Sequence, residues 1–321
     1  MPVLFWILAF CISVLAALVF MVLWIVQCGK ARNKTVSRIQ NEQQALPTQE
    51  WFPDRSPSTL IIVHACYNVE VVERCLESLM YTMDAIAVVV ENPSPRSEEM
   101  KSMVSKFKKR RLVYKHIMMN ENFWGFPYLY PAAKGKLKEF LSLPFVCLTD
   151  GDVEFEPDCF GWLDECTTLL KKHTGKLGLV AVEVDRSNFP PWATNADFVR
   201  NWKEQEEQKH RTQEGYYRAR TGFQMVCMPK PLYMQIVSEF IQDGTLFLDS
   251  NLYGRLERHG LDYAVTENNV LYHIGWDIYT DYHKKKENSE YAGYIKFKQE
   301  SIVNCEAPPT YTGCSVLHNH T

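Results

Sequence analysis

Apolar residues follow two patterns along most of the chain. Short continuous apolar runs, typical of strands covered on both faces, alternate with segments whose apolar residues recur every three or four positions, typical of helices. The expected strands are residues 60–63, 86–90, 112–117, 145–149 and 177–184, and the expected helices are residues 68–79, 98–109, 134–141 and 159–171. This alternation predicts an α/β fold with a mostly parallel central sheet and helices on both faces. In such sheets, ligands bind at the carboxyl ends of the strands.

The first segment of the chain has a different pattern. No charged residue occurs from Val3 to Val26, and this apolar run exceeds the roughly 20 residues that a membrane-spanning helix needs. A cleavable signal peptide has a shorter apolar core and a basic start, so we expect an anchor. The predicted organisation is a transmembrane helix at residues 3–26, a polar linker at 27–58 and one domain at 59–321, with a C-terminal tail from about residue 283.

The charges beside this segment bear on its orientation. Lys30, Arg32, Lys34 and Arg38 follow the apolar run, and only the amino terminus precedes it. The positive-inside rule therefore predicts a single-pass membrane protein whose domain faces the cytosol. A single anchor followed by a polar stem is equally typical of an enzyme that faces the lumen of the Golgi or the ER. Both orientations stay open at this point.

Composition narrows the class of protein. The chain has 321 residues, of which 46% are hydrophobic, so it can bury a sizeable core. Its net charge of -3 argues against a nucleic-acid surface as its main function.

The strongest chemical signal is Asp150-Gly151-Asp152, which directly follows the apolar run at residues 145–149. Two acids at the end of a buried strand repel each other and cost desolvation energy unless a positive charge lies between them. A divalent cation held by oxygen ligands, and often shared with a phosphate, supplies that charge. Gly151 permits a sharp turn and leaves room for a ligand. The alternative is an acidic turn that faces solvent.

Further motifs occur around this pair in a fixed order. They are Ala65-Cys66-Tyr67-Asn68, Glu91-Asn92, residues 120–126, Asp150-Gly151-Asp152, residues 248–255 and residues 270–273. Their order and spacing resemble the family 2 glycosyltransferases over residues 59–276. That family has the GT-A, or nucleotide-diphospho-sugar transferase, fold, so the resemblance implies this fold and a nucleotide-sugar donor.

The resemblance also implies roles for single residues. Glu91 and Asn92 fall where the family has an acid near the nucleotide base, and Asn122 lies in a loop that contacts the donor. Asp150 and Asp152 would hold Mn²⁺ or Mg²⁺, which take oxygen ligands of the same kind, and Asp150 would also contact the donor. His273 would be a further metal ligand or a donor to phosphate, although a histidine after a strand also serves structural roles.

The base is implied by residues 248–255, where the chain departs from the family. The second acid of the family motif is replaced by Asn251, so Asp249 remains as the base that would accept a proton from the attacking hydroxyl. A single base without a covalent nucleophile implies direct displacement and inversion at the sugar carbon. The alternative is that Asp249 caps the helix predicted at residues 250–258.

We therefore predict a membrane-anchored, metal-dependent, inverting glycosyltransferase. It would transfer a sugar from a nucleotide-diphosphate sugar to a hydroxyl of a glycan, a lipid-linked molecule or a protein. One alternative is a nucleotidyltransferase, but the segment from His64 to Val69 is not the Gly-rich basic loop that such enzymes have. The other is a catalytically inactive GT-A-like protein that serves as a membrane-tethered scaffold, which the change to Asn251 favours.

Overall fold

The protein is described here from a computed structural model. The structure describes residues 57–79, 82, 84–120, 127–140, 142–156, 159, 161–190, 209–244 and 249–303. The predicted anchor at residues 3–26 and the predicted linker up to residue 56 lie outside these ranges. Within the described ranges, no helix is both long enough and apolar enough to cross a membrane.

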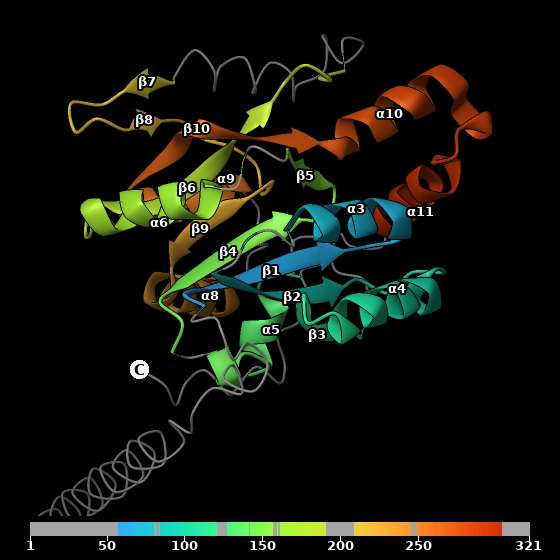
Figure 1. Ribbon diagram of the computed structural model, residues 1–321, viewed down its shortest axis with the longest axis horizontal. Coiled ribbons are helices and arrows are strands. Elements are labelled where there is room, and N and C mark those ends of the chain that lie inside the picture. The colour runs from blue at the N-terminus through green and yellow to red at the C-terminus, as the bar shows by residue number, and fades with distance from the viewer. Residues whose placement is uncertain are drawn as a thin grey trace, which may run out of the picture. The chain divides into compact units, whose positions relative to one another are not determined.

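The described residues form one mixed sheet of ten strands (Figure 1). Its order is β3-β2-β1-β4-β9-β6-β10-β8-β7, and the short strand β5 pairs with β10. The strands are β1 Thr59–Ala65, β2 Ala85–Glu91, β3 Val113–Met118, β4 Phe145–Asp150, β5 Val153–Phe155, β6 Leu177–Asp185, β7 His210–Arg211, β8 Tyr217–Arg218, β9 Val226–Pro229 and β10 Asp262–His273.

Most of the long strands run in one direction. β1 is parallel to both β2 and β4, β2 is parallel to β3, and β6 is parallel to β10. β9 is antiparallel to its two neighbours, β4 and β6, so β6 and β10 point the same way as β4. The structure confirms the predicted mostly parallel sheet and adds an inverted strand at its centre, which the sequence pattern did not assign.

Helices cover both faces of the sheet, as predicted (Figure 1). α3 (Val69–Leu79), α4 (Ser97–Lys109) and α6 (Trp162–Lys172) pack on one face, and α8 (Lys230–Asp243) and α9 (Asp249–Arg258) lie on the other. Gly178 of β6 shows how closely the second layer approaches. A Cβ there would lie 2.7 Å from Cδ2 of Leu256 in α9 and 3.1 Å from Cδ2 of Leu232 in α8.

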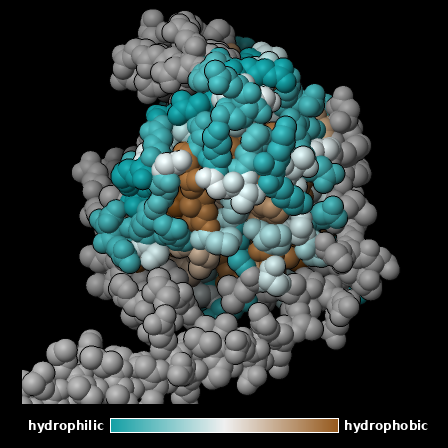
Figure 2. Space-filling model, turned by 90° about the vertical axis from the view of Figure 1, so that its left-hand side faces the viewer, coloured by the Kyte–Doolittle hydropathy of each residue, from teal (hydrophilic) through white to brown (hydrophobic). Residues whose placement is uncertain are grey.

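The apolar pattern explains this layering. Leu60, Ile61, Ile62 and Val63 of β1 are each at most 1% exposed, because both faces of the strand are covered. Burying one such side chain stabilises the fold by about 1.5–3 kcal/mol. On the face drawn in Figure 2, the described surface is mostly hydrophilic, with apolar side chains in small patches between polar ones. The hydrophobic runs of the sequence therefore lie mainly in the core.

One predicted helix is wrong. Residues 134–141 were expected to be helical, but the structure has a short helix α5 at Tyr130–Ala133 and a 3-10 turn at Lys138–Phe140. Gly135 adopts a left-handed φ of 61°, a conformation that ends a helix. The apolar spacing of this segment therefore reflects turns that pack on the core.

Strand register places distant residues together at the carboxyl edge of the sheet. His64 of β1 pairs with Asp150 of β4, and Ala65 pairs with Glu91 of β2. On the other side of β4, β5 pairs with the end of β10, and this sets His273 opposite Val153. Residues from five separate strands therefore come together at the edge where the sequence predicted a ligand site.

Gly151 connects β4 to β5 where β1 comes very close. A Cβ on Gly151 would lie 2.5 Å from the backbone oxygen of His64. Gly151 is not among the glycines with a positive φ. Close packing against β1, rather than an unusual backbone angle, is therefore what requires glycine here.

The chain after β10 returns to the same edge. α10 (Ile274–Lys285), a 3-10 turn (Lys286–Asn288) and α11 (Ala292–Val303) follow in order. Ile295 of α11 is 5% exposed and joins a small apolar cluster with Val71, Ile274 and Ile278. The region predicted as a tail from about residue 283 thus includes a helix that packs beside α3.

Candidate active site

A cavity of about 320 Å³ opens at the carboxyl ends of β1 and β4. Its polar lining includes His64, Asn68, Asp150, Asp152, Asp249 and Lys298. Three of the predicted site residues, Asp150, Asp152 and Asp249, therefore line one space, although α9 is about a hundred positions from β4 in sequence. Three carboxylates in one cavity favour a positively charged ligand or cofactor.

Asp150 is held in place by two ring side chains. The hydroxyl of Tyr128 donates to Oδ1 of Asp150 at 2.5 Å, and Nδ1 of His64 lies 3.4 Å from the same oxygen. Asn92 donates its amide N–H to Nε2 of His64 at 3.1 Å, which leaves the proton of a neutral His64 on the nitrogen that faces Asp150. Burial and then the charge of Asp150 raise the pKa of Tyr128 well above its usual range. The phenol therefore keeps its proton and stays a donor.

Asp152 is held by His273 from the end of β10. Nε2 of His273 lies 3.6 Å from Oδ1 of Asp152, and their side chains are 10% and 28% exposed. Burial acts to raise the pKa of Asp152, but the charge of the nearby His273 outweighs it, so the pKa is lowered. Burial acts to lower the pKa of His273, and the charge of Asp152 outweighs that effect and raises it. The two groups therefore stabilise each other as an ion pair.

Gly275 leaves room for the other oxygen of Asp152. A Cβ on Gly275 would lie 2.2 Å from Oδ2 of Asp152, so the carboxylate packs directly on the backbone of α10. The rings of Trp276 and His273 pack edge to face, with their centroids 4.8 Å apart. The start of α10 thus orients both members of the pair. No pattern in the sequence marks Gly275, because this contact exists only in the folded chain.

The residues at this edge fit a divalent cation that shares its coordination with a ligand. Among the described residues, no group of three or more His, Cys, Asp or Glu side chains is placed to hold a metal ion by itself. Oδ1 of Asp152 is nevertheless a buried carboxylate oxygen with no hydrogen-bond donor among the described residues. Such an oxygen is well suited to a hard cation such as Mg²⁺ or Mn²⁺, which completes its shell with waters and phosphate oxygens.

Asp249 lies in the first turn of α9, on the cavity wall. One turn later, the hydroxyl of Tyr253 accepts the backbone N–H of Thr221 at 2.9 Å. Burial raises the pKa of Tyr253 to about 12, and the nearby charge of Asp249 adds to this shift. This contact holds the loop that brings Gly222 and Gln224 to the cavity. Both predicted roles of Asp249, as a base and as a group at the helix start, are compatible with this position.

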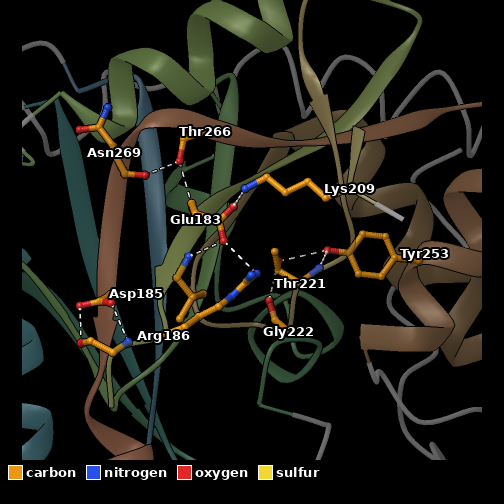
Figure 3. Close-up of polar contacts among 11 residues, drawn as sticks. Glu183, Asp185, Arg186, Lys209, Thr221, Gly222, Tyr253, Thr266 and Asn269 are labelled. Atoms are coloured by element: carbon orange, nitrogen blue, oxygen red, sulfur yellow. Dashed lines mark hydrogen bonds and ion pairs between the residues drawn. The ribbon is translucent and has the colours of Figure 1, made fainter. Parts of the chain in front are cut away.

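Another carboxylate close to this loop, that of Glu183, is paired with two cations. Figure 3 shows Glu183, at the end of β6, held between Arg186 and Lys209, with Thr221 nearby. Oε1 of Glu183 accepts from Arg186 at 3.1 Å, and Oε2 accepts from Lys209 at 2.5 Å. Glu183 is therefore engaged by two cations, which makes Asp249 the better candidate for a base. No spacing in the sequence marks this cluster, because Lys209 and Glu183 are far apart in the chain.

Glu91 and Asn92 lie behind the cavity and not on its surface. Both side chains are 0% exposed, and neither lines the cavity. Oε2 of Glu91 pairs with Nε2 of His116 at 2.7 Å, while Asn92 supports His64. Their predicted contact with a nucleotide stays a prediction. Asn122 lies outside the described residues, so its predicted donor contact also stays a prediction.

Comparisons with known proteins give distant relatives. No known family model matches the sequence. Three uncharacterised proteins of Acanthamoeba polyphaga mimivirus are similar to it, at 24% identity over 74% of this chain, 23% over 66% and 22% over 84%. The chain spans 28% of the length of the first two and 52% of the third.

Two solved structures are also similar to this chain. One is the mannosyltransferase PcManGT from Pyrobaculum calidifontis in complex with GDP-Man and Mn²⁺, with a TM-score of 0.45 and 14% identity, over 90% of this chain and 76% of that one. The other is GalNAc-T7 with UDP, GalNAc and Mn²⁺, with a TM-score of 0.44 and 10% identity, over 81% of this chain and 56% of that one.

The ion pair between Asp152 and His273 predicts a pH-dependent contribution to stability. The contribution of Asp152, whose pKa is lowered, is present above its unfolded pKa of about 3.9 and is lost as the pH falls through the folded value. The contribution of His273, whose pKa is raised, is complete below its unfolded pKa of about 6.5 and is lost as the pH rises through the folded value. His273→Gln should therefore cost about 1 kcal/mol between roughly pH 4 and 6.5, and less on either side.

Urea unfolding of both proteins in EDTA across this pH range measures the difference. The double variant Asp152→Asn/His273→Gln serves as the control, because it contains neither charge. An equal cost of His273→Gln at pH 5 and pH 9 would contradict the ion pair.

Proposed function

We propose that the chain is a metal-dependent glycosyltransferase that moves a sugar from a nucleoside-diphosphate sugar to a hydroxyl group. The observation that carries this proposal is the cavity at the carboxyl ends of parallel strands, where Asp150 and Asp152 face the same space as Asp249. A carboxylate pair that can share a cation, with a third carboxylate able to act as a base, meets the needs of sugar transfer from a diphosphate leaving group. The motif order seen in the sequence supports the same reaction.

Asp152 would hold a Mn²⁺ or Mg²⁺ ion, with Asp150 and His273 beside it. Such a cation supplies positive charge to the diphosphate as the glycosidic bond breaks. Tyr128 and His64 keep Asp150 in one orientation, while His273 pairs with Asp152 and Gly275 leaves room for its carboxylate. Fixing the carboxylates before the ligand binds lowers the reorganisation that the reaction requires.

Asp249 would act as the general base. The acceptor hydroxyl attacks the anomeric carbon, its proton passes to the carboxylate of Asp249, and the bond from that carbon to the diphosphate oxygen breaks. One displacement without a covalent enzyme intermediate inverts the configuration at the anomeric carbon. We infer an acceptor that is a hydroxyl of a glycan, a lipid-linked molecule or a protein.

Features of the site bear on the two alternative functions. Asn251 is exposed on α9 and does not line the cavity, so an asparagine there removes no carboxylate from the cavity wall. This weakens the case for an inactive scaffold. The turn between β1 and α3 contains Cys66 and Tyr67 rather than a Gly-rich phosphate loop, which weakens the case for a nucleotidyltransferase.

Asp152→Asn should abolish metal-dependent binding of the donor while the fold is retained, because the substitution removes the charge and keeps the shape. The measurement is thermal stabilisation of the full chain by a panel of nucleotide sugars with and without Mn²⁺. A ligand at a hundredfold excess over its Kd stabilises the native state by about 2.7 kcal/mol. Asp164→Asn, which changes an exposed acid on α6, is the matched control and should behave as wild type. Equal donor affinity in Asp152→Asn would remove the central claim.

Asp249→Asn distinguishes a base from a helix cap, because asparagine caps a helix start about as well as aspartate. We expect donor binding and Tm near the wild-type values and a transfer rate lower by about 10²–10⁴-fold. Single-turnover transfer with saturating donor measures this step. A variant with wild-type turnover would mean that Asp249 is a structural group and that the base lies elsewhere.

We also propose that residues 3–26 anchor the chain in a membrane by a single pass. The basic residues after this segment support a cytosolic domain, and a lumenal domain in the Golgi or ER is the alternative. Protease added to sealed vesicles should digest a cytosolic domain and leave a lumenal one intact. Protection that ends only on addition of detergent would overturn the cytosolic orientation.

A further inference from the structure

The C-terminal helix α11 (Ala292–Val303) supplies part of the cavity wall. Tyr294 and Lys298 both line the cavity and are four residues apart, so they lie on one face of the helix. Ile295, next to Tyr294, packs into the apolar cluster with Val71 of α3 and Ile278 of α10. The helix is therefore seated against the core beside the acidic pair.

A strained turn after β1 holds α11 in this position. Tyr67 has a left-handed φ of 59°, which is uncommon for a non-glycine residue. Its ring stacks on Phe297, with the centroids 5.2 Å apart, and contacts Tyr294 at 6.0 Å. A Cβ on Gly293 would lie 2.5 Å from the Tyr67 hydroxyl, so the helix backbone touches this ring directly. These contacts of Tyr67 hold α11 in its position beside the cavity.

Lys298 stays charged in this environment. Its ammonium group hydrogen-bonds the hydroxyl of Tyr279 and lies 5.1 Å from the centroid of that ring. Burial acts to lower the pKa of Lys298, but Tyr279 and then the charges of Asp152 and Asp150 outweigh it and raise the pKa. The side chain therefore presents a cation to the acidic side of the cavity.

The charge balance of the cavity gives this cation a role. Among the described residues that line the cavity, Lys298 is the one lysine or arginine, against the carboxylates of Asp150, Asp152 and Asp249. A divalent cation offsets two of these negative charges, and an arriving diphosphate adds at least two more. A second cation at the cavity is therefore favourable once a diphosphate is bound.

We propose that Lys298 binds the diphosphate of the donor and that α11 is part of the donor site. This inference rests on the proposed function and assigns a residue to the leaving group. As the bond from the sugar to the diphosphate breaks, the lysine stabilises the charge that develops on the leaving oxygen. The competing role is structural: Lys298 would only join α11 to Tyr279.

The experiment compares Lys298→Met with Lys296→Met in the full chain. Lys296 is exposed on the same helix and does not line the cavity, so its variant loses the same charge without touching the site. The probes are inorganic pyrophosphate, UDP and GDP, each with Mn²⁺, and the nucleosides uridine and guanosine. Calorimetry gives the affinities, and Tm without ligand reports the fold.

Lys298→Met should weaken the binding of pyrophosphate, and of the nucleoside diphosphate that the wild type binds, by about tenfold to a hundredfold. Lys298→Arg should recover part of the affinity, whereas Lys296→Met should bind as wild type. Affinity for the matching nucleoside should be unchanged, because the lysine contacts phosphate. If Lys298→Met lowers Tm, then Lys298→Gln, which keeps a polar side chain, repeats the measurement.

Two results would overturn the inference, and they are distinguishable. Wild type that binds a nucleoside diphosphate with Mn²⁺, together with Lys298→Met and Lys298→Gln that bind it equally well, would make Lys298 a structural residue and leave the proposed function intact. Wild type that binds no probe containing a diphosphate would overturn both the inference and the proposed function.

Discussion

The repulsion between Asp150 and Asp152 is the constraint around which this edge of the sheet is organised. Two carboxylates separated by one residue at the end of a buried strand destabilise the fold unless each is compensated. The structure compensates them separately, with Tyr128 and His64 on Asp150 and with His273 on Asp152. The three partners come from distant parts of the chain, so the acidic pair depends on the register of the whole sheet.

That register also explains why two glycines lie at the site. Gly151 permits the backbone of β1 to approach β4, and Gly275 permits the carboxylate of Asp152 to rest on α10. A side chain at either position would meet an atom at 2.5 Å or less. The two glycines therefore allow the carboxylates and their partners to lie at contact distance, whereas a larger residue at either position would push them apart.

The sequence predicted those parts of the structure that depend on consecutive residues, namely buried strands and their ends. The apolar run before Asp150 predicted a buried strand, and the acids at its end marked the carboxyl edge, because strand burial and strand ends are written in consecutive residues. The pairing of His273 with Asp152 rests on the antiparallel contact of β5 with β10, which no spacing reveals. The sequence also does not reveal which way the side chain of Glu91 points. In the structure it pairs with His116 and does not line the cavity. Lys298 had no signal at all, since a lysine on a late helix resembles many solvated lysines.

Three buried polar atoms without hydrogen-bond partners in the described part of the chain lie in the cavity wall or directly behind it. Oδ1 of Asp152, Nδ1 of His273 and Oε1 of Gln224 are buried and have no hydrogen-bond partner among the described residues. A buried polar atom without a hydrogen bond, such as Oε1 of Gln224, costs about 1–3 kcal/mol, so the fold is less stable at this edge than a fully paired one would be. A ligand that offers a cation to Asp152 and hydroxyl groups to Gln224 would recover part of that cost on binding. Part of the affinity for such a ligand would then come from pairing atoms that have no partner in the free protein. This is a physical reason why a well-packed sheet retains an acidic cavity with unpaired polar atoms.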